Sequence, residues 1–276
     1  MNIKYICPHW GSEKAKAGEF VERVQNNGYE GIEINLPRQA DFCRDFMQKV
    51  DNIRQEDPHF TLILQHILSP QTANIADFIT EIKRYWLYLA AFEPTCINSH
   101  TGKDYFTFDE NSRILEVYEQ LSQQTGIPVY HEIHRGRFSF HAPSLVPYLQ
   151  RFPSLSMVGD FSHFCVVSES LLEGQEAFIE QIIPHIKHIH ARVGSQQASQ
   201  VSDPAAPEWQ PHLHRFLGWW KQMVAYHRQR ATDTLTITPE FGPSPYMPAL
   251  PFTQQPIGNQ WEINLFMKDF LRKNLG

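Results

Sequence analysis

The sequence has few cysteines, and none of them forms a Cys-x-x-Cys pair. Four occur in 276 positions: Cys7, Cys43, Cys96 and Cys165. Four scattered cysteines do not suggest a disulfide framework and are typical of the reduced thiols of a cytoplasmic protein. The chain also lacks an apolar run long enough for a signal peptide or a transmembrane helix. We therefore expect a cytoplasmic protein that has no membrane segment.

Positive charge is in deficit as well. Lys and Arg number 24 against 30 Asp and Glu, which gives a net charge of −6. Neutralisation of phosphates supplies most of the affinity of DNA- and RNA-binding proteins, so a nucleic-acid partner is not expected. Linkers and low-complexity tracts are lacking too, while 42% hydrophobic residues are enough for a large core. We expect one domain over residues 1–276, and the sequence leaves a homo-oligomer open.

Short apolar runs alternate with segments of helical periodicity along the whole chain. The strand candidates are residues 3–7, 31–36, 61–66, 96–100, 128–132, 156–160, 185–191 and 235–240. Amphipathic helices are predicted between them, for example over 16–28, 74–91 and 112–126, and Gly28 and Gly126 are placed to end two of these helices. Eight strand–helix repeats predict a (β/α)8 TIM barrel.

Polar residues close most of these strands at intervals of about 30 residues. They are Glu33, His66, His100, Glu132, Asp160 and His190. Glu240 follows only after about 50 residues, so we expect an inserted, lid-like loop around 194–212. A barrel brings all its strand carboxyl ends to one mouth, which explains the pattern better than an open sheet does.

Four of the polar residues close consecutive strands: Glu132, Asp160, His190 and Glu240. Carboxylates at such close quarters repel one another unless a cation neutralises them. One histidine with three carboxylates suits Mn²⁺, Zn²⁺, Mg²⁺ or Co²⁺ and leaves positions for a substrate. For any one residue alone, a helix cap or an isolated polar strand end remains the alternative.

Further polar residues are expected at the same mouth. His66 and His100 are predicted to donate hydrogen bonds to a substrate, with structural or second-metal roles as alternatives. His163 follows Asp160 in a D-x-x-H motif and can reach metal or substrate. Arg135, Arg137 and Arg192 suit a phosphate or carboxylate, although ion pairs with neighbouring loops remain open. His188 is predicted to be a packed residue deeper in the barrel.

The motifs "YHEIHRG", "GDFSH", "HIHARVG" and "TPEFG", with "GYEGIEI" at 28–34, together resemble the xylose isomerase-like TIM barrel superfamily. That group contains sugar isomerases, ketose epimerases and apurinic endonucleases. The resemblance covers nearly the whole chain. It implies that Glu132, Asp160, His190 and Glu240 hold a divalent metal, and that His163 and Arg192 face the substrate. The endonuclease branch expects Asp-x-His after the seventh strand, whereas this chain has Asp203 and Ala205 there.

The expected activity is therefore metal-dependent isomerisation or epimerisation of a sugar, a sugar phosphate or a related polyol. The metal would acidify a carbon-bound proton, and Glu132 and Glu240 would act as general base and acid. Two alternatives remain: an endonuclease-type phosphodiester hydrolase, and a dehydratase of a cyclitol or keto-sugar.

Overall fold

The computed structural model describes residues 1–68 and 74–276. Its internal contacts divide the chain into two compact units. The N-terminal unit comprises residues 6–132 and 136–138, and the C-terminal unit comprises residues 1–5, 133–135 and 139–276. Within the described residues, no helix is both long and apolar enough to cross a membrane.

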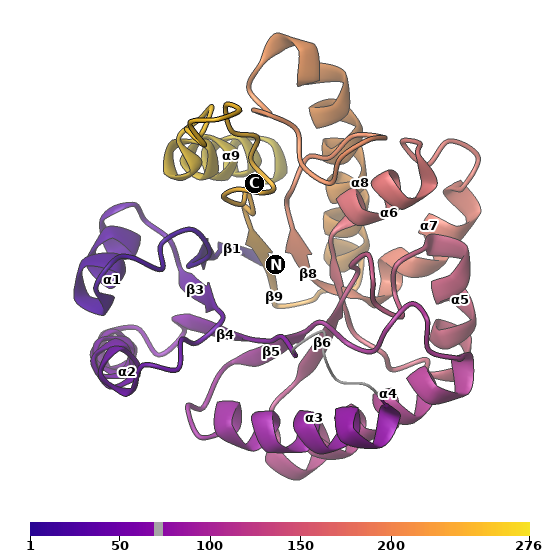
Figure 1. Cartoon of the computed structure of the whole chain (residues 1–276), viewed down its shortest axis with the longest axis horizontal. Coiled ribbons are helices and arrows are strands. Elements are labelled where there is room, and N and C mark those ends of the chain that lie inside the picture. Colours follow the sequence, from indigo (N-terminus) through magenta and orange to yellow (C-terminus); the bar gives the residue numbers. More distant parts are fainter. Residues whose placement is uncertain (69–73) are drawn as a thin grey trace. The chain divides into compact units, whose positions relative to one another are not determined.

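The N-terminal unit alternates parallel strands with helices (Figure 1). Its strands are β2 (Cys7–Pro8), β3 (Gly31–Ile34), β4 (Thr61–His66), β5 (Cys96–Ser99) and β6 (Val129–Glu132), paired in that order. The helices are α1 (Ala17–Asn26), α2 (Ala40–Glu56), α3 (Ile75–Ala90) and α4 (Phe108–Thr125), and α1 lies beside α2. Because the strands are parallel, their carboxyl ends share one edge of the sheet.

The C-terminal unit repeats this plan with the strand order β1-β9-β8-β7. The strands are β1 (Asn2–Tyr5), β7 (Met157–Gly159), β8 (Ile186–His190) and β9 (Thr234–Thr238). The helices are α5 (Ala142–Arg151), α6 (Phe161–Ser168), α7 (Glu176–Ile182), α8 (Gln210–Gln229) and α9 (Gln260–Leu275), with short 3₁₀ turns η1 (Ile183–His185) and η2 (Pro207–Trp209). Here too the strand carboxyl ends lie together.

The predicted first strand is divided in two. Ile6 separates β1, which pairs with β9, from β2, which pairs with β3. The predicted last strand ends at Thr238, so Glu240 lies two residues beyond β9 rather than within it. Gly28 and Gly126 have φ values of +64° and +71°, which confirms them as left-handed residues that follow helices.

The insert after β8 differs in extent from the predicted loop at 194–212. Its last part is already helical, because η2 begins at Pro207 and α8 at Gln210. The preceding loop is fixed by its own hydrogen bonds. Gln200 is buried and exchanges two bonds with the backbone of Gly242, at 3.0 and 2.7 Å. The residues before η2 are thus tied to the loop that follows β9, and the lid function stays a prediction.

Candidate functional site

Asp160, His190 and Glu240 come together at the carboxyl edge of β7, β8 and β9. Asp160 directly follows β7, His190 is the last residue of β8, and Glu240 stands just beyond β9. One ligand atom from each side chain lies within 4.8 Å of the others, and all three residues are buried. The Nδ1 atom of His190 is 2.8 Å from Oε2 of Glu240. The sequence-based grouping of these three residues therefore agrees with the geometry.

Asp160 uses its two carboxylate oxygens differently. Oδ1 accepts a hydrogen bond from the backbone N–H of Ser162 at 3.1 Å and another from the Ser162 hydroxyl, so Asp160 caps helix α6. Oδ2 faces Arg192 and His163. The helix cap raised as an alternative from the sequence is present, and it still leaves one oxygen directed to the cluster.

Arg192 joins the two carboxylates of this cluster. Its Nε donates to Oδ2 of Asp160 at 3.0 Å, and its Nη2 donates to Oε2 of Glu240. The residue is only 3% exposed, so the guanidinium compensates buried negative charge. Burial raises the pKa of Asp160 to about 6, and the charge of Arg192 acts in the opposite direction.

His163 and Tyr246 extend the cluster. His163 is fully buried, with Nε2 3.6 Å from Oδ2 of Asp160, and its ring packs 3.9 Å from that of His134. The Tyr246 ring lies between two guanidiniums, 4.7 Å from Arg192 and 5.0 Å from Arg135. Sequence reasoning missed Tyr246, because an aromatic residue in a long loop after the last strand carries no periodic signal.

A second polar network lies at the carboxyl edge of the N-terminal unit. The Asn98 amide nitrogen donates to Glu132 at 2.7 Å and to Glu33 at 2.8 Å, and it thereby joins two buried carboxylates. Gln65 donates to Glu33 at 3.1 Å, and Nε2 of His100 lies 3.1 Å from Glu132. Glu132 is therefore held in a defined position. The role of Asn98 was not foreseen, since an amide inside a short strand looks like any partly polar strand residue.

Burial lowers the pKa of two histidines near this network. His66 is fully buried, its Nδ1 lies 2.6 Å from the Tyr118 hydroxyl, and burial lowers its pKa to about 3. His131 bonds to Thr101 at 2.6 Å, and burial lowers its pKa to about 3 as well. The expected contact of His66 with substrate stays a prediction.

His188 in the C-terminal unit has the structural character predicted for it. It is fully buried and bonds to the hydroxyls of Thr236 and Thr238 at 2.7 and 3.1 Å. These bonds engage both ring nitrogens and fix the ring inside the strand layer.

The other two arginines have different surroundings. Arg135 is exposed, donates to the Ser199 hydroxyl at 2.8 Å and stacks on Tyr246. Arg137 is partly buried, and its Nε has no hydrogen-bond partner among the described residues. The ion pairs considered as alternatives for these two arginines are thus not found in the described part of the chain.

The cluster of Asp160, His190 and Glu240 fits a divalent metal. An ion about 2.1 Å from each donor requires ligand atoms within roughly 4.2 Å of one another, close to the 4.8 Å limit within which the three atoms fall. One imidazole and two carboxylates suit Mg²⁺, Mn²⁺ or Zn²⁺. These same carboxylates now bond Arg192, so a bound metal would share them with the guanidinium.

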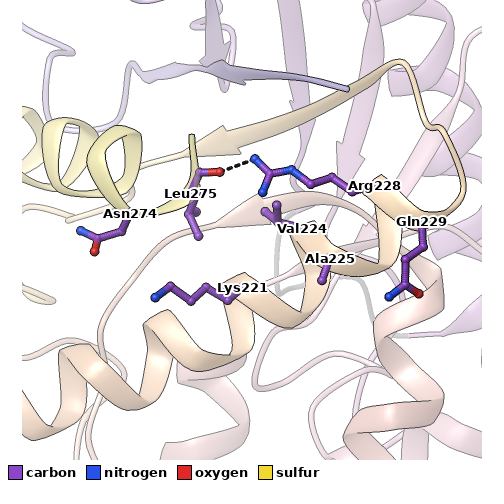
Figure 2. Close-up of a pocket in the computed structure, with 7 residues that line it drawn as sticks. All are labelled: Lys221, Val224, Ala225, Arg228, Gln229, Asn274 and Leu275. Carbon is purple, nitrogen blue, oxygen red and sulfur yellow. Dashed lines mark hydrogen bonds between the residues drawn. The ribbon is translucent and has the colours of Figure 1, made fainter.

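A cavity of about 410 Å³ lies elsewhere in the C-terminal unit, between the ends of α8 and α9 (Figure 2). Arg228 donates to the Leu275 carbonyl at 2.6 Å across it. Because α8 ends just before β9 begins, this cavity belongs to the amino ends of the strands. That end of a barrel serves stability rather than catalysis.

No family model and no curated protein matches the chain. Among solved structures, it is similar to a xylose isomerase-like TIM barrel protein from Mycobacterium smegmatis in complex with magnesium, at 11% identity and a TM-score of 0.60, covering 99% of this chain and 98% of the other. The 3-keto-D-glucoside 4-epimerase YcjR from E. coli has 14% identity and a TM-score of 0.58, covering 99% and 100%. The probable 3-DHS dehydratase AsbF from Bacillus anthracis has 17% identity and a TM-score of 0.62, with the same coverage.

The chain therefore has the fold of the xylose isomerase-like barrels, a TIM-like α/β barrel of parallel strands that alternate with helices. This confirms the predicted fold class. At these identities the likeness concerns the fold, and the function has to be argued from the residues of this chain.

Proposed function

We propose that the protein is a divalent-metal-dependent enzyme that isomerises or epimerises a sugar, a sugar phosphate or a related polyol. The observation that carries the proposal is the buried cluster of Asp160, His190 and Glu240 at the strand carboxyl ends. In TIM barrels, residues at this end perform the chemistry. A keto-glucoside epimerase and a magnesium-containing protein among the structural neighbours support the choice of reaction and of metal.

Asp160, His190 and Glu240 would hold the metal, and Glu132 is proposed as a fourth ligand on the sequence argument. A bound divalent ion would polarise the carbonyl and hydroxyl oxygens of the substrate and so acidify the proton on the hydroxyl-bearing carbon next to the carbonyl. The buried position of each ligand keeps water from competing for the charges.

Glu132 and Glu240 are proposed as the general base and acid. Each carboxylate is buried and positioned by donors, Glu132 by Asn98 and His100 and Glu240 by Arg192. Fixed carboxylates suit proton transfer, because a base must stay within hydrogen-bond reach of the proton it removes. His163 and Arg192 would bind substrate oxygens beside Glu240, and His66, His100, Arg135 and Arg137 are proposed as further substrate contacts.

The direct test is a screen of ketoses, keto-glycosides, sugar phosphates and cyclitols in D₂O with magnesium- or manganese-loaded protein. Proton transfer predicts an isomer or epimer that carries solvent deuterium on carbon, detected by NMR. Product without deuterium would indicate a hydride shift between carbons instead.

Two other outcomes would replace the proposal. Loss of water from the substrate would identify a dehydratase, which the same carboxylates can support and which one structural neighbour represents. Incision of an abasic-site duplex at low salt, abolished in a His66→Ala, His100→Ala variant, would identify a phosphodiester hydrolase.

A further inference from the structure

Two cationic side chains belong to neighbouring loops at the carboxyl edge of the N-terminal unit. Lys103 lies in the loop between β5 and α4, and Arg137 follows β6. Strands β5 and β6 are paired and parallel, so both loops leave the same edge of the sheet. Burial is the main cause that lowers the pKa of Lys103, and the positive charge of Arg137 lowers it further. The two cations therefore repel each other electrostatically.

Neither cation has an anionic partner within the described residues 1–68 and 74–276. Lys103 is only 4% exposed, and its Nζ approaches the face of Phe78 at 5.8 Å without an ion pair. Nε of Arg137 is buried without an acceptor. Burying two like charges without a counter-charge is costly, and a bound anion removes that cost.

The acidic groups nearby do not fill this role. Asp104 is exposed and makes no ion pair with Lys103, although its charge raises the pKa of that lysine. The carboxylate of Glu132 acts in the same direction on Arg137, but it is already engaged by Asn98 and His100. Asp104 and Glu132 therefore offset part of the positive charge from a distance, but neither carboxylate forms an ion pair with Lys103 or Arg137.

The loop that carries Lys103 is fixed before any ligand binds. The Asn111 side chain accepts a bond from the Lys103 backbone N–H at 3.2 Å and donates to its carbonyl at 2.9 Å. Gly102 has a φ of +61°, and a Cβ there would overlap the Asn111 side chain. The backbone of Phe138 bonds to Thr101 at 3.4 Å and ties the Arg137 segment to the same loop. A site ordered in advance loses little entropy on binding.

We propose that Lys103 and Arg137 form a subsite for the carboxylate or phosphate group of an acidic polyol substrate. The guanidinium suits bidentate contact with either group, and the ammonium adds a point charge. This inference rests on the proposed function and narrows it, because it excludes neutral sugars as the preferred substrates. Glu132, one of the proposed acid–base residues, raises the pKa of Arg137 through its negative charge, so the subsite and that carboxylate are electrostatically linked.

The test is calorimetric titration of the full chain, without added metal and at low ionic strength. Inorganic phosphate represents a phosphoryl group and glycerate represents a carboxylated polyol, so the two titrations distinguish the two sources of negative charge. We expect saturable binding of at least one probe. Lys103→Gln and Arg137→Gln should each weaken that binding by about tenfold or more, since each removes a charged hydrogen-bond donor.

Lys83→Gln and Arg113→Gln are the matched controls, because both residues are exposed and each substitution removes one positive charge. They should leave binding unchanged. Absence of saturable binding, or equal weakening in the controls, would overturn the subsite. Lys103→Met preserves the volume of the side chain and replaces Lys103→Gln if that variant does not fold. Metal content is measured separately, so failure of the metal site and failure of the anion subsite give different results.

Discussion

Glu132 is held by hydrogen bonds with Asn98 and His100, and Glu240 by a hydrogen bond from Arg192. Because these partners differ, each glutamate can be tested separately. Glutamine keeps an oxygen ligand and nearly the same shape but cannot accept the substrate proton. Glu132→Gln and Glu240→Gln should retain substantial metal and lose at least about a hundredfold in turnover, the usual contribution of general acid–base catalysis. Steady-state rates on the substrate found by the screen, with parallel elemental analysis, provide the measurement.

Glu176→Gln is the control for this pair, because Glu176 is 61% exposed at its side chain. It should leave the rate unchanged. Near wild-type turnover in both active-site variants, with metal retained, would show that these carboxylates do not transfer the proton.

Replacement of Arg192 should lower the free energy of unfolding. Arg192→Gln leaves Asp160 and Glu240 buried without the guanidinium that now bonds both of them. The free energy of unfolding of metal-free protein should fall by about 3–5 kcal/mol, the usual effect of breaking a buried pair. Saturating magnesium should recover part of this loss, because a cation replaces the missing charge. Urea unfolding with and without metal tests this.

Arg84→Gln serves as the matched substitution, since Arg84 forms an exposed pair with Glu81 on α3. This substitution should leave the free energy of unfolding almost unchanged, because solvent screens an exposed ion pair. An equally small effect of Arg192→Gln would mean that the two carboxylates do not depend on the guanidinium for charge compensation.

At the scale of elements, the positions of the strands followed from the sequence because each apolar run is short and is closed by a polar residue. This placement also put Asp160, His190 and Glu240 at consecutive strand ends, and one ligand atom from each lies within 4.8 Å of the others. The break at Ile6 was not foreseeable, since it depends on pairing of β1 with β9 and of β2 with β3. Helix α4 begins at Phe108 rather than Ser112, because a capping box of Thr107 and Glu110 fixes its start.

Two helix glycines should respond to alanine with opposite signs. Gly126 ends α4 with a φ of +71°, which alanine adopts only with strain, so Gly126→Ala should destabilise the protein by about 1 kcal/mol. Gly218 lies inside α8, and a Cβ added there would meet no neighbouring side chain within 4 Å, so Gly218→Ala should stabilise the protein by up to about 1 kcal/mol. Thermal or urea unfolding of the two variants compares them directly. The same sign for both would contradict either the left-handed conformation of Gly126 or the open space beside Gly218.

At the scale of the whole molecule, stability should fall in acid because of the buried histidines. The pKa of His66 and that of His131 are lowered from 6.5 to about 3. As pH falls below 6.5, the unfolded chain takes up protons that the folded chain does not bind. The stability from these groups is therefore complete above pH 6.5 and is lost toward pH 3, at up to about 1.4 kcal/mol per pH unit for each histidine.

Unfolding by urea at several pH values between about 5 and 7 measures this slope. His131→Gln should reduce it by up to about 1.4 kcal/mol per pH unit, whereas His214→Gln, on the exposed side of α8, should leave it unchanged. A flat profile for wild-type protein would contradict the burial of these histidines. The cytoplasmic location and the single-domain organisation stay predictions.

Metal content is the measurement that decides whether Asp160, His190 and Glu240 hold a divalent metal. Protein is saturated with magnesium or manganese, dialysed, and measured by elemental analysis beside Asp160→Ala, His190→Ala and Asp269→Ala. Asp269 is 74% exposed at its side chain on α9 and provides the matched control. Asp160→Asn preserves an oxygen that can cap α6 and covers the case in which the alanine variant does not fold.

We expect about one metal ion per chain in wild-type protein and in Asp269→Ala, and a marked loss of metal in Asp160→Ala and His190→Ala. Circular dichroism spectra like that of the wild type would exclude unfolding as the cause. Unchanged metal content in both site variants, or none in saturated wild-type protein, would contradict the metal centre.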